Sequence, residues 1–140
     1  AVLGRLLIDP SVSIATARCA ITDQSEFNNP NVVKVVVNSA EDALYFSRLP
    51  IPYQQNEVTL SDNVFGFKHI GLYAYRRPIL LELGKLSPTA LERTEQLEQL
   101  RALQYGYRIT TVETDDNPIG VDTAEDLDKV RRLVLTGVTE

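Results

Sequence analysis

The feature that most constrains the fold is a run of β-branched residues followed closely by a second apolar segment. Residues 32–37 read Val-Val-Lys-Val-Val-Val, a composition typical of a β-strand. Residues 43–48 form another candidate strand after the short polar connection 38–42. This spacing predicts an antiparallel hairpin. Pro50 and Pro52 then end the hydrogen-bonded ladder, because proline has no backbone N–H to donate.

A third strand is predicted over residues 69–76, where side-chain character alternates with a period of two. This pattern predicts one core face and one face of polar rings, made respectively of Ile70, Leu72 and Ala74 and of His69, Gly71, Tyr73 and Tyr75. Further strands are expected over residues 13–17 and 107–112, and helices over 1–8, 78–84 and 91–105. Thr123 is expected to cap a last helix whose buried stripe is Leu127, Val130, Leu133 and Val134.

Strands that pair locally and strands separated by helices together predict an α/β fold with a mixed sheet. The chain has 140 residues and is 44% hydrophobic, enough for the core of one domain over residues 1–140. Its 14 Lys and Arg against 19 Asp and Glu give a net charge of −5, which disfavours nucleic-acid partners. Cys19 is the only cysteine, which fits a reducing cytoplasm. No apolar run approaches the roughly 20 residues that cross a bilayer, so no membrane partner is expected.

Polar side chains on the predicted helix 91–105 are the first candidates for a site. A rotation of about 100° per residue separates a leucine stripe from a side that carries Glu95, Glu98, Gln99 and Ala102. That side is either a solvated acidic face or the wall of a cleft.

Three other residues have both a structural and a functional interpretation. His69 is the only histidine and is either a satisfied structural group or part of a site beside Tyr73. Arg48, between a strand and a proline-containing turn, is either a surface residue or a stiffly held partner for a carboxylate. Asp122 either caps the last helix or holds a magnesium ion that carries substrate phosphates.

Taken together, six sequence blocks resemble the carboxy-terminal part of the 3-deoxy-manno-octulosonate (Kdo) cytidylyltransferases, also called CMP-Kdo synthetases. The blocks occur in the family's order and extend from Asn29 to the end of the chain. They are Asn29-Pro-Asn-Val-Val-Lys-Val-Val36, Tyr45-Phe-Ser-Arg48 with Pro50-Ile-Pro52, His69-Ile-Gly-Leu-Tyr-Ala-Tyr-Arg76, Ser87-Pro88 with Leu91-Glu92, Leu97-Glu-Gln-Leu-Arg101, and Gly120-Val-Asp-Thr123 with Glu125-Asp-Leu127.

The resemblance implies a nucleotide-diphospho-sugar-transferase-like (Rossmann-like) sheet, and a homodimer formed through an inserted antiparallel element. It implies transfer of CMP from CTP to Kdo with magnesium, giving CMP-Kdo and pyrophosphate for lipopolysaccharide or capsule. The residues that it assigns to the sugar site are His69, Tyr73, Glu98 and Gln99, with Arg48 as the partner of the carboxylate. Asp122 would be a magnesium ligand.

The sequence departs from this family in one large respect. The family's amino-terminal half, with the nucleotide loop and a further metal-binding aspartate, has no counterpart in these 140 residues. We therefore expect the fold to be incomplete and the chain alone to be inactive. The alternatives are a noncatalytic dimerising or sugar-binding module with this fold, and a relative that acts on sialic acid.

Overall fold

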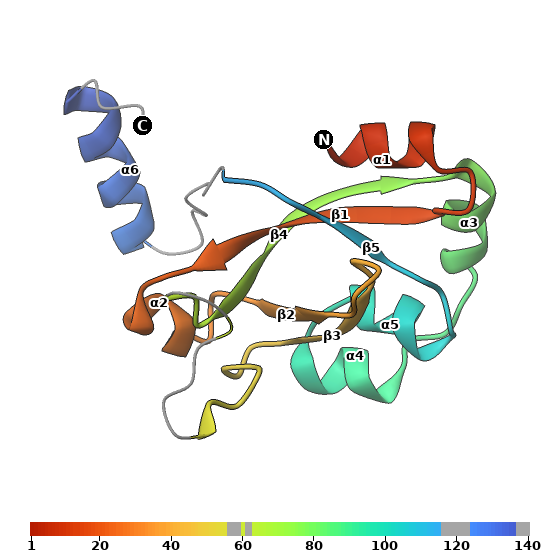
Figure 1. Ribbon diagram of the computed structural model, residues 1–140, viewed down its shortest axis with the longest axis horizontal. Helices are drawn as coiled ribbons and strands as arrows, with labels where there is room; N and C mark the ends of the chain where they lie inside the picture. Colours follow the sequence, from red (N-terminus) through yellow and green to blue (C-terminus); the bar gives the residue numbers. More distant parts are fainter. Residues whose placement is uncertain (56–59, 61–62, 116–123, 137–140) are drawn as a thin grey trace.

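The computed structural model describes residues 1–55, 60, 63–115 and 124–136 and has the expected α/β architecture (Figure 1). Helices and strands alternate irregularly along the chain. In order they are α1 (Val2–Ile8), β1 (Ile14–Ile21), α2 (Gln24–Asn28), β2 (Lys34–Val37), β3 (Ala43–Ser47), β4 (Gly66–Tyr75), α3 (Arg77–Leu83), α4 (Ala90–Glu95), α5 (Gln99–Gln104), β5 (Thr110–Glu113) and α6 (Ala124–Thr136).

The sheet is mixed, as predicted, and its strand order is β3-β2-β4-β1-β5. Only the β1–β5 pair is parallel among these neighbours; the other pairs are antiparallel. The predicted hairpin is confirmed as β2 and β3, with Val35 opposite Phe46. β1 is longer than expected and lies between β4 and β5, and almost all of its residues are buried.

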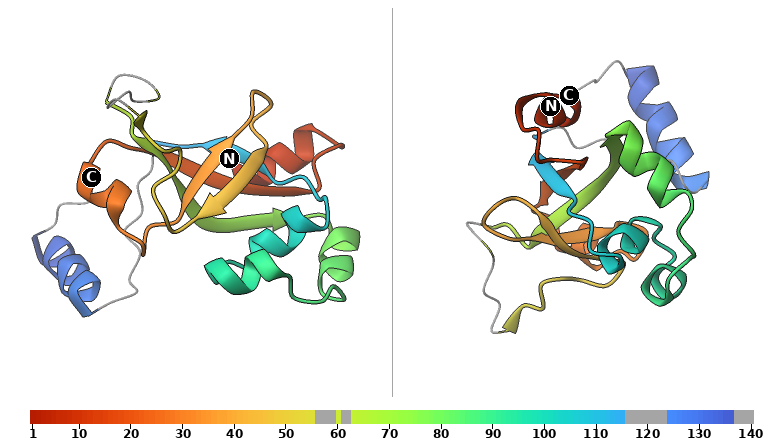
Figure 2. Two further views of the ribbon diagram at one scale, coloured as in Figure 1. Left: turned by 90° about the horizontal axis from the view of Figure 1, so that it is seen from below. Right: turned by 90° about the vertical axis from the view of Figure 1, so that its right-hand side faces the viewer.

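The predicted alternation on β4 is only partly right, because both faces make core contacts and Leu72, which was expected in the core, is 60% exposed. Ile70 and Ala74 pack against the cluster that includes Val2 from α1. Tyr73 and Tyr75 pack against the larger cluster, which includes residues from α5 and the hairpin. Figure 2 shows α1 and the pair α4–α5 on opposite sides of the sheet. The tyrosine rings are therefore part of the main core.

The single helix expected over residues 91–105 is wrong, because the chain breaks between α4 and α5. The predicted Thr89–Glu92 capping box begins α4. Gln96 then adopts a left-handed backbone, with φ of 55°, and its side-chain amide donates to the Arg93 carbonyl at 2.6 Å. Leu97, just after the break, is buried, so the leucine spacing continues across the break. Periodicity alone therefore does not reveal where the helix ends.

The predicted buried stripe of the last helix is also wrong for the positions that can be assessed. Leu127 is 39% exposed and Val134 is 71% exposed on α6. Figure 1 places α6 to one side of the sheet, so the amphipathic pattern does not face the core there. The predicted cap, Thr123, lies outside the described residues.

Within the described ranges, no helix is long and apolar enough to span a lipid bilayer.

Candidate functional site

A cavity of about 430 Å³ lies between β4, α3 and the start of α5. β4 contributes the rings of Tyr73 and Tyr75, which stack with their centroids 5.7 Å apart. The walls from α3 are leucine side chains, and Glu98 and Gln99 enter from the break before α5. A mostly apolar hollow with a few convergent polar groups is typical of a small-molecule site.

Glu98 and Gln99 reach the cavity because of the helix break. Glu98 is the N-cap residue of α5, and its backbone directly follows the left-handed turn at Gln96. Glu95, which an unbroken helix would place on the same face, points elsewhere. Its carboxylate accepts hydrogen bonds from the Ser47 hydroxyl at 2.7 Å and from the backbone N–H of Arg48 at 3.0 Å. The break therefore separates the two predicted sugar-site residues from the rest of the acidic face.

Tyr73 connects this cavity with the half-buried His69. Its ring lines the cavity and lies 5.3 Å, between centroids, from the imidazole of His69. Burial raises the pKa of Tyr73, which keeps the hydroxyl protonated as a donor. This hydroxyl is itself buried, and the Thr16 side chain interacts with it.

His69 lies behind Tyr73 rather than in the cavity lining. Its ring packs edge-on against Phe46, with centroids 5.0 Å apart, and its Nε2 is 3.0 Å from the hydroxyl of Thr16. Burial lowers the pKa of the imidazole from 6.5 to about 4, so the ring is neutral at physiological pH. The structure thus fits the structural interpretation of this histidine, and contact of His69 with a sugar stays a prediction.

Arg48 does not line the cavity. Its guanidinium donates to backbone carbonyls, from Nε to Glu95 at 3.0 Å and from Nη1 to Pro30 at 3.2 Å. The prediction of a stiffly held guanidinium therefore agrees with its surroundings, but its present partners are carbonyl oxygens at the end of α4 and in the segment before β2. Contact with a ligand carboxylate stays a prediction.

The predicted metal ligand, Asp122, lies outside the described residues. Within the part of the chain that the structure describes, no three His, Cys, Asp or Glu side chains gather to hold a metal ion. These residues alone do not make a magnesium site, so no step is derived through the metal.

The predicted site residues other than Asp122 all lie in the segment that matches a known family. A family model described as cytidylyltransferase matches residues 2–109. The chain belongs to the cytidylyltransferase family.

Relatives of this cytidylyltransferase chain carry a more specific name. This chain is 47% identical over 135 residues to a 3-deoxy-manno-octulosonate cytidylyltransferase of Solibacter usitatus. The match covers 96% of this chain and 52% of the relative. It is 50% identical over 135 residues to the protein of that name from Geotalea daltonii, covering 91% of this chain and 53% of the relative. The chain thus spans about half the length of these curated relatives.

A solved structure also resembles the fold closely. It is described as CMP:2-keto-3-deoxy-manno-octonic acid synthetase complexed with CTP, and it matches with a TM-score of 0.85 and 41% sequence identity. The match covers 98% of this cytidylyltransferase chain and 55% of that structure's chain.

Sequence reasoning missed two residues that support the site. Thr16 contacts His69 from β1, and Arg101 forms an ion pair with Glu92 that joins α5 to α4. A threonine inside a largely apolar strand is a usable signal, because a buried hydroxyl needs a partner. The Glu92–Arg101 pair has no such signal, since its spacing of nine residues matches no single helix.

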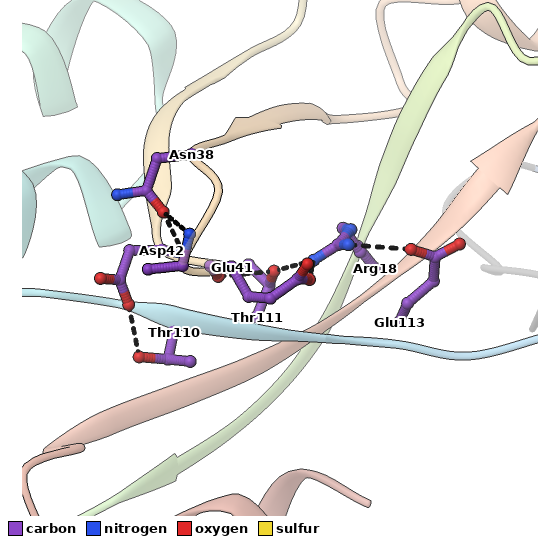
Figure 3. Close-up of polar contacts among 8 residues, drawn as sticks. Arg18, Asn38, Glu41, Asp42, Thr110, Thr111 and Glu113 are labelled. Carbon is purple, nitrogen blue, oxygen red and sulfur yellow. Dashed lines mark hydrogen bonds and ion pairs between the residues drawn. The ribbon is translucent and has the colours of Figure 1, made fainter. Parts of the chain in front are cut away.

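A second polar cluster lies away from the cavity and joins the hairpin connection to β5 (Figure 3). Arg18 is 3% exposed and forms ion pairs with Glu41 and, at 2.8 Å, with Glu113. Its guanidinium also lies 4.7 Å from the centroid of the Phe67 ring. The Thr111 hydroxyl accepts a hydrogen bond from Arg18 and donates one to the Glu41 carbonyl at 2.9 Å. These contacts connect β1, β5 and the hairpin, which is a structural role for the cluster.

Proposed function

We propose that the protein transfers CMP from CTP to Kdo and releases pyrophosphate. The observation that carries this proposal is the cavity in which Tyr73, Glu98 and Gln99 meet. All three belong to segments that the family resemblance assigns to the sugar site. The names of the relatives identify Kdo as the substrate. The size and the side chains of the cavity are compatible with a polyhydroxylated acid such as Kdo.

The side chains around the cavity suit such a ligand. The Glu98 carboxylate accepts hydrogen bonds from sugar hydroxyls, and the Gln99 amide both donates and accepts. The Tyr73 hydroxyl donates, because its raised pKa keeps it protonated. Apolar side chains such as Leu83 and Ile109 face the carbon skeleton and exclude water. Together these residues orient the sugar so that one of its hydroxyls faces the nucleotide.

In the proposed reaction, the anomeric hydroxyl oxygen attacks the α-phosphorus of CTP. A new P–O bond forms as the bond to the bridging oxygen breaks, and pyrophosphate leaves. The hydroxyl proton passes to solvent or to a base. No covalent bond to the protein is needed, so the chain's own residues act by binding and orientation.

Three further properties belong to this proposal. Magnesium would neutralise phosphate charge, with Asp122 as one ligand and the other ligands supplied by the phosphates or by residues beyond those described. Arg48 would bind the sugar carboxylate after its guanidinium exchanges carbonyl partners for it. The protein would act as a homodimer in the cytoplasm.

The test is pyrophosphate release by the intact gene product. Release that needs CTP, Kdo and magnesium together supports the proposal. No release, or release with N-acetylneuraminic acid but not with Kdo, overturns it. Binding of Kdo without turnover would identify a noncatalytic module instead.

A matched pair of variants connects this activity to the cavity. Gln99→Ala should raise the KM for Kdo about tenfold by removing hydrogen bonds to the sugar, with little change in the KM for CTP. Gln104→Ala is the control: the same residue type on the same helix, outside the cavity lining. Equal effects of the two variants on Kdo would contradict the assignment.

A further inference from the structure

Glu95 is the last residue of α4, and its carboxylate is bound to the end of β3. Its two oxygens accept hydrogen bonds from the Ser47 hydroxyl at 2.7 Å and from the backbone N–H of Arg48 at 3.0 Å. The contact runs in both directions, because Nε of Arg48 donates to the backbone carbonyl of Glu95 at 3.0 Å. Ser47 is 2% exposed and ends β3, so the end of α4 is tied to a buried part of the sheet.

The negative charge of Glu95 also lies close to a buried lysine. Lys34 is fully buried in β2, and its ammonium donates to three backbone carbonyls, one of which belongs to Arg48. Burial lowers the pKa of Lys34 to about 8, and the charge of Glu95 opposes that shift. Glu95 and Lys34 thus bind the N–H and the carbonyl of Arg48, which fixes the residue that Glu95 is tied to.

The end of α4 matters because the next four residues, Gln96, Leu97, Glu98 and Gln99, all line the cavity. Gln96 has a left-handed backbone, and such a conformation at a residue other than glycine persists where the surrounding structure imposes it. Here the attachment of Glu95 to β3 precedes the turn, and the buried Leu97 follows it. The attachment of Glu95 therefore determines the direction in which the chain enters the cavity wall.

We propose that Glu95 is a positioning residue of the sugar site: by tying the end of α4 to β3, its carboxylate places Glu98 and Gln99 at the cavity. The inference rests on the proposed function in taking these two side chains to bind the sugar. Glu95 does not line the cavity itself, so it acts through residues that do. Its oxygens are engaged by donors from β3 and the residue after it, which separates this role from direct binding of a ligand.

Hydrogen exchange of the intact gene product tests the attachment without any ligand. The amides of Leu100 and Arg101 close the first turn of α5, with N–H to carbonyl distances of 3.1 and 3.0 Å. Glu95→Ala should speed their exchange about tenfold, because the start of α5 loses its connection to β3. Unchanged exchange of these amides in Glu95→Ala overturns the proposal.

Glu26→Ala is the matched control for this measurement. The Glu26 carboxylate also joins a helix to the sheet, through an ion pair with Lys68 at 2.9 Å. Figure 1 and Figure 2 show its helix, α2, and α5 toward opposite ends of the sheet. Exchange in α5 should therefore stay unchanged in Glu26→Ala. Equal acceleration in the two variants would mean a general loss of stability and would contradict the specific role of Glu95.

Kinetics on the intact gene product test the role in sugar binding. Glu95→Ala should raise the KM for Kdo about tenfold, with the KM for CTP unchanged. Glu95→Gln should bring the KM back to within about twofold, because an amide can accept from the Arg48 N–H and donate to the Ser47 oxygen. If Glu95→Ala does not fold, Ser47→Ala removes one of the two hydrogen bonds and should raise the KM about threefold. An unchanged KM for Kdo in the folded variant contradicts the proposal.

A double variant shows whether Glu95 acts through Gln99. Independent effects multiply, so Glu95→Ala combined with Gln99→Ala would then raise the KM for Kdo about a hundredfold. We expect a rise well below that product, because a side chain that is already removed cannot be misplaced. A rise equal to the product overturns the proposal. If the unmodified protein releases no pyrophosphate at all, the proposed function fails, while hydrogen exchange still decides whether Glu95 places the start of α5.

Discussion

The pH dependence of stability tests most sharply whether the half-buried imidazole of His69 stays neutral in the folded chain. Burial lowers the pKa of the imidazole from 6.5 to about 4. Between those values the unfolded chain binds a proton that the folded chain excludes, so the free energy of unfolding falls as the pH falls. Linkage predicts a loss of about 2.5 kcal/mol between about pH 7.5 and pH 4.5. Urea unfolding followed by circular dichroism at several pH values measures it.

Other shifted groups titrate mainly outside this window. The carboxyls of Asp9 and Glu92 have pKa values below their ordinary 3.8 and 4.5, so their stabilising contribution is lost only at still lower pH. Desolvation lowers the pKa of Lys34 to about 8, above the window. His69→Gln removes the titrating group, and the difference between the two proteins isolates the imidazole. Equal slopes for both proteins would mean that the folded chain accepts the proton freely, which refutes the buried neutral histidine.

Two further predictions concern the packing around Gly66 and the break between α4 and α5. Gly66→Ala should destabilise the fold by about 1–3 kcal/mol, because its Cβ would lie 2.7 Å from the Phe27 ring. Gly71→Ala on the same strand meets nothing within 4 Å and should change urea stability by less than about 0.5 kcal/mol, so equal losses would contradict the described packing. Glu92→Gln should lower the urea midpoint and raise the KM for Kdo, because Arg101 on α5 loses the carboxylate of α4 with which it forms an ion pair. An unchanged midpoint and an unchanged KM would show that this ion pair does not hold α5 in place.

Local patterns were sufficient to predict much of this fold. The valine run and the short polar connection predicted the β2–β3 hairpin, because strand propensity and turn length both act over a few residues. Pro78 in the first turn and Gly84 at the end predicted α3 for the same reason. The alternation around Tyr73 correctly separated Ile70 and Ala74 from Tyr73 and Tyr75, but it also placed in the core Leu72, which is exposed.

Features that depend on distant contacts could not be predicted in this way. The left-handed turn at Gln96 leaves the leucine spacing intact, so periodicity predicts a continuous helix. The bulge opposite Thr16 depends on how β1 and β4 pair, which no single strand encodes. The resemblance named Tyr73, Glu98 and Gln99, which the structure brings to one cavity. It also named His69 and Arg48, which do not line this cavity; Arg48 instead donates to backbone carbonyls of other segments of the chain.

The most direct test of the account is a crystal structure of the intact gene product with Kdo bound. We expect the sugar in the cavity between β4 and α5, in contact with Tyr73, Glu98 and Gln99. A sugar bound on another surface, with these three side chains untouched, would contradict it.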